Sequence, residues 1–217
     1  MLRNKFTLLG VAAVLVGSSV GLATSASATT TLFNTSAASV QCGSIIAASA
    51  SIAPPLSSAS TGTATIKVKG TLGDCVSTGA TVGGNPQEPT IVSGSFSGTL
   101  NTTGAPGCAG LLSPSTIAGN LVLKWKVASG QKLDFSSTTL SGGTITGGTF
   151  TGPLGNLYGQ FTLAGQTFGP KSAFIGGTPS TVAATSEDVG QLGAGCLGAP
   201  PGPGIKTIHL ALGVAIG

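Results

Sequence analysis

Charged residues are the scarcest feature of this 217-residue sequence. Asp, Glu, Lys and Arg together make up 6% of it, and it contains a single histidine. Beyond residue 28 the basic residues are seven lysines, without any arginine. Proteins that bind nucleic acids need clustered basic side chains for the phosphates, together with contacts to the bases. The sequence therefore predicts no nucleic-acid partner.

Groups that commonly catalyse reactions are also few. His209 is the only candidate base of a hydrolase triad, no G-x-S-x-G turn occurs beyond residue 28, and the alternation of Ile208 and Leu210 points it away from the core. A glycosidase needs two carboxylates on opposite sides of one cleft, and a calcium site needs several oxygen ligands close together. Neither pattern is formed by the acids, which are scattered along the chain: Asp74, Glu88, Asp134, Glu187 and Asp188. The cysteines lack the C-x-x-C spacing of zinc sites. These shortages predict a protein that is not an enzyme and holds neither metal nor cofactor; a hydrolase is the least favoured function.

The first 28 residues have the pattern of a secretory signal peptide. Arg3 and Lys5 precede a mostly apolar stretch over 7–23, and Ala26-Ser27-Ala28 matches an A-x-A cleavage site. Gly and Ser interrupt the apolar stretch, which is short for a membrane anchor, and the closing apolar run over 205–217 is too short to span. We therefore expect a secreted protein without a transmembrane segment in its mature chain.

The four cysteines predict two disulfide bonds, because an even number in an exported chain is typical of oxidised pairs. Three pairings are possible. We favour Cys75–Cys108 together with Cys42–Cys196, since the first closes a loop of moderate length and the second would join the beginning of the chain to its end.

Alternating apolar and polar residues dominate the rest of the chain and predict an all-β fold. Residues 29–60 are rich in Ala and Ser, and we expect short strands there, followed by one domain over 61–217. The clearest strand covers 117–127, with Trp125 in phase with the apolar residues and therefore assigned to the core. Since no amphipathic helix of useful length is evident, we predict an antiparallel β-sandwich, or a flattened barrel, of about eight to ten strands.

The segment 141–152, SGGTITGGTFTG, has neither charge nor a strong metal ligand. Threonine favours strands, whereas glycine allows a strand to bend or another backbone to come close. The segment therefore predicts a curved wall of the sheet with an uncharged threonine surface. A repeat solenoid is the alternative, but the motif recurs too few times to sustain a stack.

These motifs resemble a loose group of small secreted, disulfide-containing, β-rich proteins of actinobacteria, most of them uncharacterised. The resemblance rests on SGSFSGTL at 93–100, the I-x-G-x-L-x-L-x-W strand at 117–125, GTITGGTFTG at 143–152 and the late Cys196. It departs from the group at Lys124 and Lys126, which flank Trp125. It implies a fold and an extracellular location, and it implies no catalytic residue.

Two features are candidates for binding. Lys67 with Lys69 and Lys124 with Lys126 each share one face of a strand, and they would form one basic patch if their strands were neighbours. Such a patch suits an anionic cell-wall polymer, although exposed lysines also serve solubility and protect strand edges. Tyr158, after a Gly-Asn turn, is the candidate ring for a glycan. We expect an extracellular or cell-envelope structural protein first, and a binding module for a glycan, small ligand or protein second.

Overall fold

The computed structural model describes residues 30–57, 62–103, 114–151, 155–197, 204–211 and 214–216. Strands predominate in it, which confirms the predicted all-β class, and one 11-stranded sheet stands beside two sheets of two strands each. The elements, in chain order, are β1 (Thr31–Phe33), β2 (Ser39–Leu56), β3 (Thr65–Thr78), β4 (Thr81–Val82), β5 (Asn85–Pro86), β6 (Ile91–Thr103), β7 (Ser115–Val127), β8 (Gln131–Leu133), β9 (Ser137–Ser141), β10 (Thr144–Thr151), β11 (Leu157–Ala164), β12 (Thr167–Phe168), β13 (Ser180–Asp188), α1 (Val189–Leu197), β14 (Ile205–Ala211) and β15 (Val214–Ile216).

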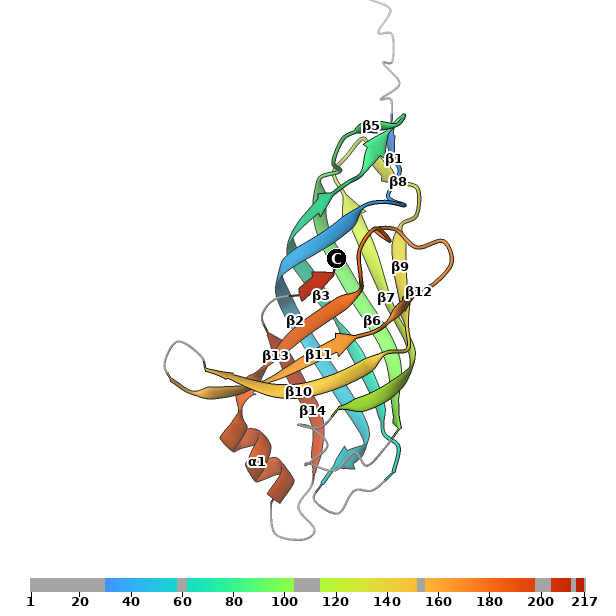
Figure 1. Ribbon diagram of the computed structural model, residues 1–217. Coiled ribbons are helices and arrows are strands. Elements are labelled where there is room, and N and C mark those ends of the chain that lie inside the picture. The colour runs from blue at the N-terminus through green and yellow to red at the C-terminus, as the bar shows by residue number, and fades with distance from the viewer. Residues whose placement is uncertain are drawn as a thin grey trace, which may run out of the picture.

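The large sheet closes on itself (Figure 1). Its strands follow the order β10-β11-β13-β14-β2-β3-β6-β7, and β7 returns to β10 because Ser115 and Thr116 pair with Ile145 and Thr144. Farther along the same edge, β7 pairs with β9. The described strands thus form one closed antiparallel sheet, which agrees with the predicted barrel, whereas the predicted sandwich is not confirmed. A closed sheet of about eight strands has an interior just wide enough for packed side chains or one small ligand.

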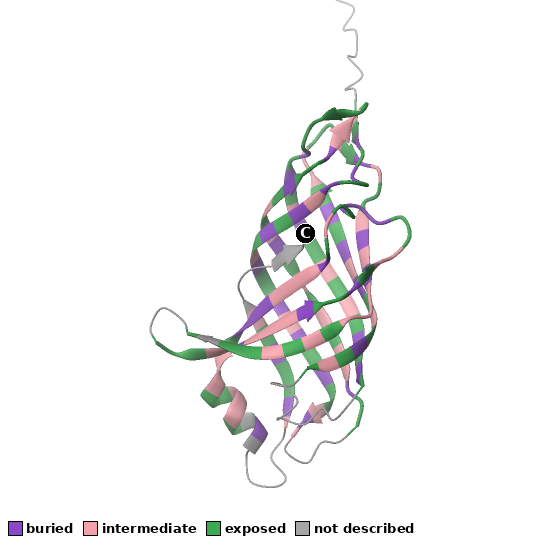
Figure 2. Cartoon of the chain, viewed as in Figure 1, coloured by how far each residue is buried: buried purple, intermediate pink, exposed green. Residues whose placement is uncertain are grey.

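Strand β7 shows how the sequence sets the two faces of the sheet. Leu121, Leu123 and Trp125 are 4%, 1% and 7% exposed, whereas Lys124 and Lys126 between and beyond them are exposed. This period of two is the period of a pleated strand, whose successive side chains point to opposite faces. Figure 2 shows the same alternation of buried and exposed residues along most of the closed sheet.

The N-terminal Ala/Ser-rich segment forms the longest strand. Instead of the expected short strands, β2 runs for 18 residues and pairs with β3 along one edge and β14 along the other. Its register with β3 shifts between Ile46 and Ser49, where Ala47 has a φ of 49°. An extra residue of this kind bends a strand and increases its twist, which allows so long a strand to follow a closed sheet.

Aromatic side chains fill one part of the interior, here called the filled part: Phe33, Trp125 and Phe174. Phe33 is 0% exposed, and the rings of Trp125 and Phe174 meet edge to face at 5.4 Å. The indole Nε1 donates a hydrogen bond of 2.8 Å to Thr138 Oγ1. The expectation that Trp125 belongs to the core is confirmed.

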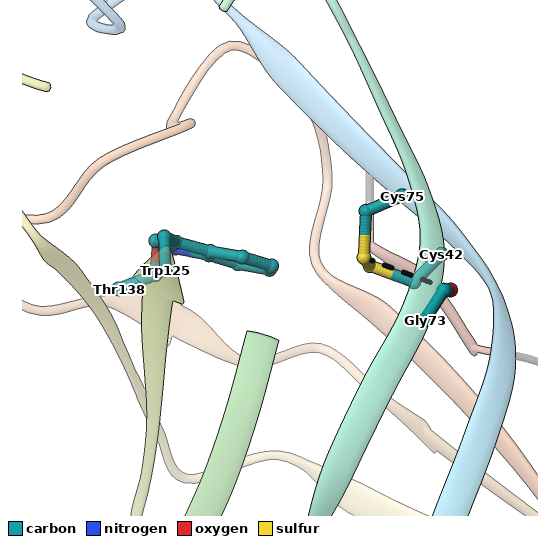
Figure 3. The surroundings of a disulfide bond; sticks show 5 residues. All are labelled: Cys42, Gly73, Cys75, Trp125 and Thr138. Atoms are coloured by element: carbon teal, nitrogen blue, oxygen red, sulfur yellow. Dashed lines mark hydrogen bonds between the residues drawn. A yellow bond between two sulfur atoms is a disulfide. The ribbon is translucent and has the colours of Figure 1, made fainter. Parts of the chain in front are cut away.

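The predicted disulfide pairing is wrong. Cys42 is bonded to Cys75, so neither Cys75–Cys108 nor Cys42–Cys196 forms (Figure 3). The physical reason is the register of β2 with β3, which places Cys42 directly opposite Cys75 with their Cα atoms 3.9 Å apart. Cys196 is not a free thiol, and Cys108 lies outside the described residues.

The segment SGGTITGGTFTG joins two strands at a corner. Gly142 and Gly143 have φ values of 66° and 111°, which glycine adopts without strain, and they connect β9 to β10. From Thr144 onward β10 pairs with β11 along its whole length, and Figure 1 shows this hairpin extending beyond the closed sheet. The segment thus forms a strand from Thr144 onward, as the predicted wall requires, whereas Gly142 and Gly143 form a turn instead of continuing the wall.

The helix α1 was not expected from the sequence. Asp188 precedes it and accepts a 2.7 Å hydrogen bond at Oδ1 from the Gln191 backbone NH, while Gln191 Oε1 accepts one from the Asp188 NH at 3.2 Å. This reciprocal arrangement is a capping box, which satisfies backbone donors at the start of a helix. Within the described ranges, no helix is long and apolar enough to cross a membrane.

Candidate functional site

The closed sheet contains a cavity with a volume of about 140 Å³. All eight strands of the ring contribute to its wall, which places it inside the sheet. Along β3 alone the lining runs from Ala64, just before the strand, to Leu72, a span of about 26 Å at the rise of an extended chain. The cavity wall is therefore long in the direction of the strands.

The wall consists almost entirely of aliphatic side chains and Phe. Ile52 and Ile66 come from β2 and β3, Leu100 and Leu123 from β6 and β7, and Phe161 from β11. They belong to the inward face because each strand alternates. A cavity of similar size in another protein, about 150 Å³ and equally apolar, stays dry and binds benzene.

Small residues explain why this part of the interior is hollow. Ala50, Gly147 and Ala183 occupy inward positions on three different strands of the wall. Each lacks the bulk that a Leu or Phe would carry toward the centre of the sheet. The cavity is hence a result of which side chains face inward, and not of a gap between strands.

Three hydroxyl-bearing residues line the cavity: Thr102, Ser115 and Thr181. The Thr102 Oγ1 accepts a hydrogen bond from the Ala64 NH at 3.1 Å and donates to the Ala64 carbonyl at 3.4 Å. Thr181 Oγ1 is buried and has no partner among the described residues. Ser115 and Thr181 are therefore the polar side chains of the wall that can bond to something else.

Among the described residues, no charged side chain lines the cavity. All the lysines and acids beyond residue 28 lie in described parts of the chain, and none of them is a lining residue. The lysines are exposed to solvent. An ion inside the cavity would have no partner of opposite charge.

The four predicted binding lysines lie on the outer face but do not form the compact patch that neighbouring strands would give. Strand β6 lies between β3 and β7, so the condition set by the sequence is not met. In the register, Lys69 lies opposite Ser97, and Lys124 lies opposite Ser95 two residues away. The result is a broad basic surface in which small hydroxyl residues separate Lys67 and Lys69 from Lys124 and Lys126.

Tyr158, the predicted glycan-binding ring, lies on β11 opposite Phe150 of β10 and Asp188 of β13. The residue is partly buried. It does not line the cavity, and it lies on a different part of the sheet from the four lysines. The structure therefore does not bring the five predicted binding residues together.

His209 points outward, as the sequence predicts, and contacts Glu187. Its Nδ1 lies 2.6 Å from Glu187 Oε1, and its backbone NH donates to the same carboxylate at 3.1 Å. Partial burial alone would raise the pKa of Glu187, but the hydrogen bonds from His209 outweigh it, and the net pKa lies below the ordinary value of 4.5. The His209 side chain is 65% exposed, so this pair lies on the surface.

Two other acids serve local structure. Glu88 accepts hydrogen bonds from the backbone NH groups of Gly79 and Ala80 at 2.7 and 3.1 Å, and Asp134 accepts one from Thr35 Oγ1 at 2.6 Å. Across the part of the chain that the structure describes, no three His, Cys, Asp or Glu side chains are grouped as a metal site requires. These carboxylates thus hold loops in place.

Sequence reasoning missed the cavity because it assigned every inward face to a packed core. The one available signal was the small size of inward residues such as Ala50 and Ala183, together with the glycines of β10. That signal becomes readable only when strands from distant parts of the chain are known to face one another. No protein family, curated protein or solved structure matches this chain.

Proposed function

We propose that this protein is a secreted binding protein that holds a small apolar ligand inside its closed sheet. The single observation that carries the proposal is the apolar cavity to which all eight strands of the ring contribute. Natural binding sites for small molecules are concave, mostly apolar and equipped with a few polar groups. A small ligand is one of the partners that the sequence predicts for a binding module, its second expected function.

A cavity in the interior lowers the stability of the folded protein, and a bound ligand can offset this loss. At about 24 cal/mol per Å³, a cavity of 140 Å³ corresponds to about 3 kcal/mol relative to a filled core. A ligand that fills the space restores contacts and removes its own apolar surface from water. Binding to the folded state should therefore raise the melting temperature in proportion to the logarithm of ligand concentration.

The test uses oxidised protein of residues 29–217 and neutral apolar probes such as benzene and octan-1-ol. Isothermal titration calorimetry should show saturable binding, which an Ala183→Leu substitution should weaken at least tenfold by filling the cavity. Ala164→Leu is the matched control, because Ala164 is exposed on β11 and does not line the cavity. Equal affinities of the two variants, or no binding by the unaltered protein, would contradict the proposal.

Secretion is part of the proposal. The basic start, apolar stretch and A-x-A site over residues 1–28 support it, and these residues lie outside the described part of the chain. The Cys42–Cys75 bond supports it too, because disulfides persist in oxidising compartments. Detection of a mature N-terminus at Thr29 in culture medium would test it, and the resemblance to secreted actinobacterial proteins remains a prediction of the same kind.

A second disulfide, between Cys108 and Cys196, completes the predicted pair of bonds. It is supported by the even number of cysteines and by the pairing of the other two with each other. Peptide mapping without reduction should recover a peptide that joins these two residues. Alkylation of Cys108 in the native protein would contradict it.

The outer lysines favour a second candidate function, association with the cell envelope through an anionic polymer or glycan. Strands β6 and β7 carry no acidic residue, so the surface around Lys124 and Lys126 has one sign of charge. Binding to isolated cell walls should weaken with salt. It should also be lost when Lys67, Lys69, Lys124 and Lys126 are all changed to Ala; binding that is insensitive to both changes would exclude this surface. In both candidate functions the protein is not an enzyme.

A further inference from the structure

We propose that the cavity selects a neutral amphiphile, an apolar molecule with one uncharged hydrogen-bonding group, and rejects the ionised carboxylate of the same length. This inference rests on the proposed function, since it concerns the ligand of the same cavity. It assigns the Thr181 hydroxyl as the partner of the polar group, and the Ser115 hydroxyl as a separate partner for the same group when the ligand lies in the other orientation. An alkan-1-ol represents the chemical class.

The absence of charge in the wall carries the first half of the argument. None of the described lysines or acids is a lining residue, and His209 lies on the outer face. A carboxylate inside the cavity would lose its hydration without gaining a cation or a set of aligned donors. A hydroxyl group of similar size loses far less hydration free energy on entering the cavity. The uncharged wall therefore favours the neutral alcohol over the carboxylate.

The hydroxyl groups of Ser115 and Thr181 are available to bind the polar group of the ligand. Thr181 lies opposite Leu163, Leu163 opposite Ile145, and Ile145 opposite Ser115 in the register of the sheet. Ser115 and Thr181 therefore stand at the two ends of one row, with two aliphatic residues between them. No side-chain hydrogen bond is formed by either residue within the described ranges, whereas the third hydroxyl of the wall, on Thr102, is bonded to Ala64.

The Thr181 hydroxyl is able to change direction without losing a bond. Its Oγ1 is covered by the surrounding protein atoms, although the residue lines the cavity. A rotation about the Cα–Cβ bond would redirect Oγ1, and no described partner would be left behind. A buried polar atom without a partner is unfavourable, so pairing it with a ligand hydroxyl adds to affinity.

The experiment compares octan-1-ol with octanoate by isothermal titration calorimetry on oxidised protein of residues 29–217. At pH 8 the alcohol should bind at least tenfold more tightly than the carboxylate. At pH 4, where most of the octanoate is protonated, the two affinities should come within about threefold of each other. Binding of neither compound would contradict the proposed function as well, whereas equal binding of both at pH 8 would overturn only the present inference.

Variants locate the polar contact. Thr181→Val keeps the shape of the side chain, and together with Ser115→Ala it should weaken octan-1-ol binding at least fivefold while leaving benzene binding unchanged. Thr99→Val is the matched control, because Thr99 is exposed on the outer face of β6. If the double variant bound octan-1-ol as tightly as the Thr99→Val protein, the assignment of Ser115 and Thr181 would be wrong. Benzene binding shows in the same samples that the cavity is intact.

Discussion

The filled part and the cavity lie within the same closed sheet but differ in the size of the side chains that face inward. Strand β7 reaches both: Trp125 packs against Phe174 in the filled part, while Leu121 lines the cavity. Around the cavity, the small residues Ala50 and Gly147 occupy inward positions where larger side chains would fill the interior. The comparison shows that small inward side chains leave a cavity where β7 begins beside β10, whereas large aromatic side chains fill the interior beyond the point where β7 pairs with β9.

Loss of the indole ring should produce the largest effect. Trp125→Ala removes a side chain that is 7% exposed, and it should lower the free energy of unfolding by about 3–5 kcal/mol. Phe161→Ala, on the cavity wall, should lower the free energy of unfolding by less than about 3 kcal/mol, because its ring borders the cavity and has fewer packed neighbours to lose. Urea unfolding of both variants measures the difference. Equal losses would mean that the two parts of the interior are packed alike.

The disulfide beside the filled part ranks next. Replacing both Cys42 and Cys75 with Ala should lower the free energy of unfolding by about 2–4 kcal/mol, since the bond closes a loop with a sequence separation of 33. Octan-1-ol affinity should change less than threefold, because neither residue lines the cavity. Loss of ligand binding in a variant that remains folded would show that the two parts are coupled.

Replacing the buried amide of Gln166 should change the free energy of unfolding by a smaller amount, and in the stabilising direction. Gln166 is 5% exposed, and its Oε1 and Nε2 have no partner among the described residues. Its Cγ would lie 2.9 Å from a Cβ added to Gly143, at the corner between β9 and β10. Gln166→Met keeps the length of the side chain and should raise the free energy of unfolding by about 1 kcal/mol. A loss of stability measured by urea unfolding would indicate that the amide binds an ordered water molecule.

The smallest expected effect on stability comes from the contact between Glu187 and His209 on the outer face of the sheet. The pKa of Glu187 is lowered in the folded protein, so its contribution to stability is complete above the ordinary value of 4.5 and is lost as the pH falls through the lower folded value. The loss should stay below about 1 kcal/mol, because His209 is exposed to solvent. Glu187→Gln should remove this part of the pH dependence between pH 6 and pH 3. A variant with an unchanged pH profile would exclude the His209 contact as its source.

Regular alternation made several elements predictable. The strand around Trp125 and the outward direction of His209 follow from the period of side chains along a strand, whereas the turn at Gly142 and Gly143 divides a segment that was expected to be one curved wall. The Ala/Ser-rich strand β2 was underestimated, because Ala and Ser have weak strand preference and its bulge at Ala47 interrupts the alternation.

The sequence by itself determined the all-β class and which side chains share a face, because both depend on neighbours along the chain. Only the tertiary structure decided that Cys42 bonds to Cys75, that β6 separates the lysine-bearing strands, and that the inward faces enclose a cavity. Each of these depends on the order and register of strands that are distant in sequence. Register brings two cysteines within bonding distance, and closure of the sheet sets the small residues Ala50 and Ala183 around one shared space.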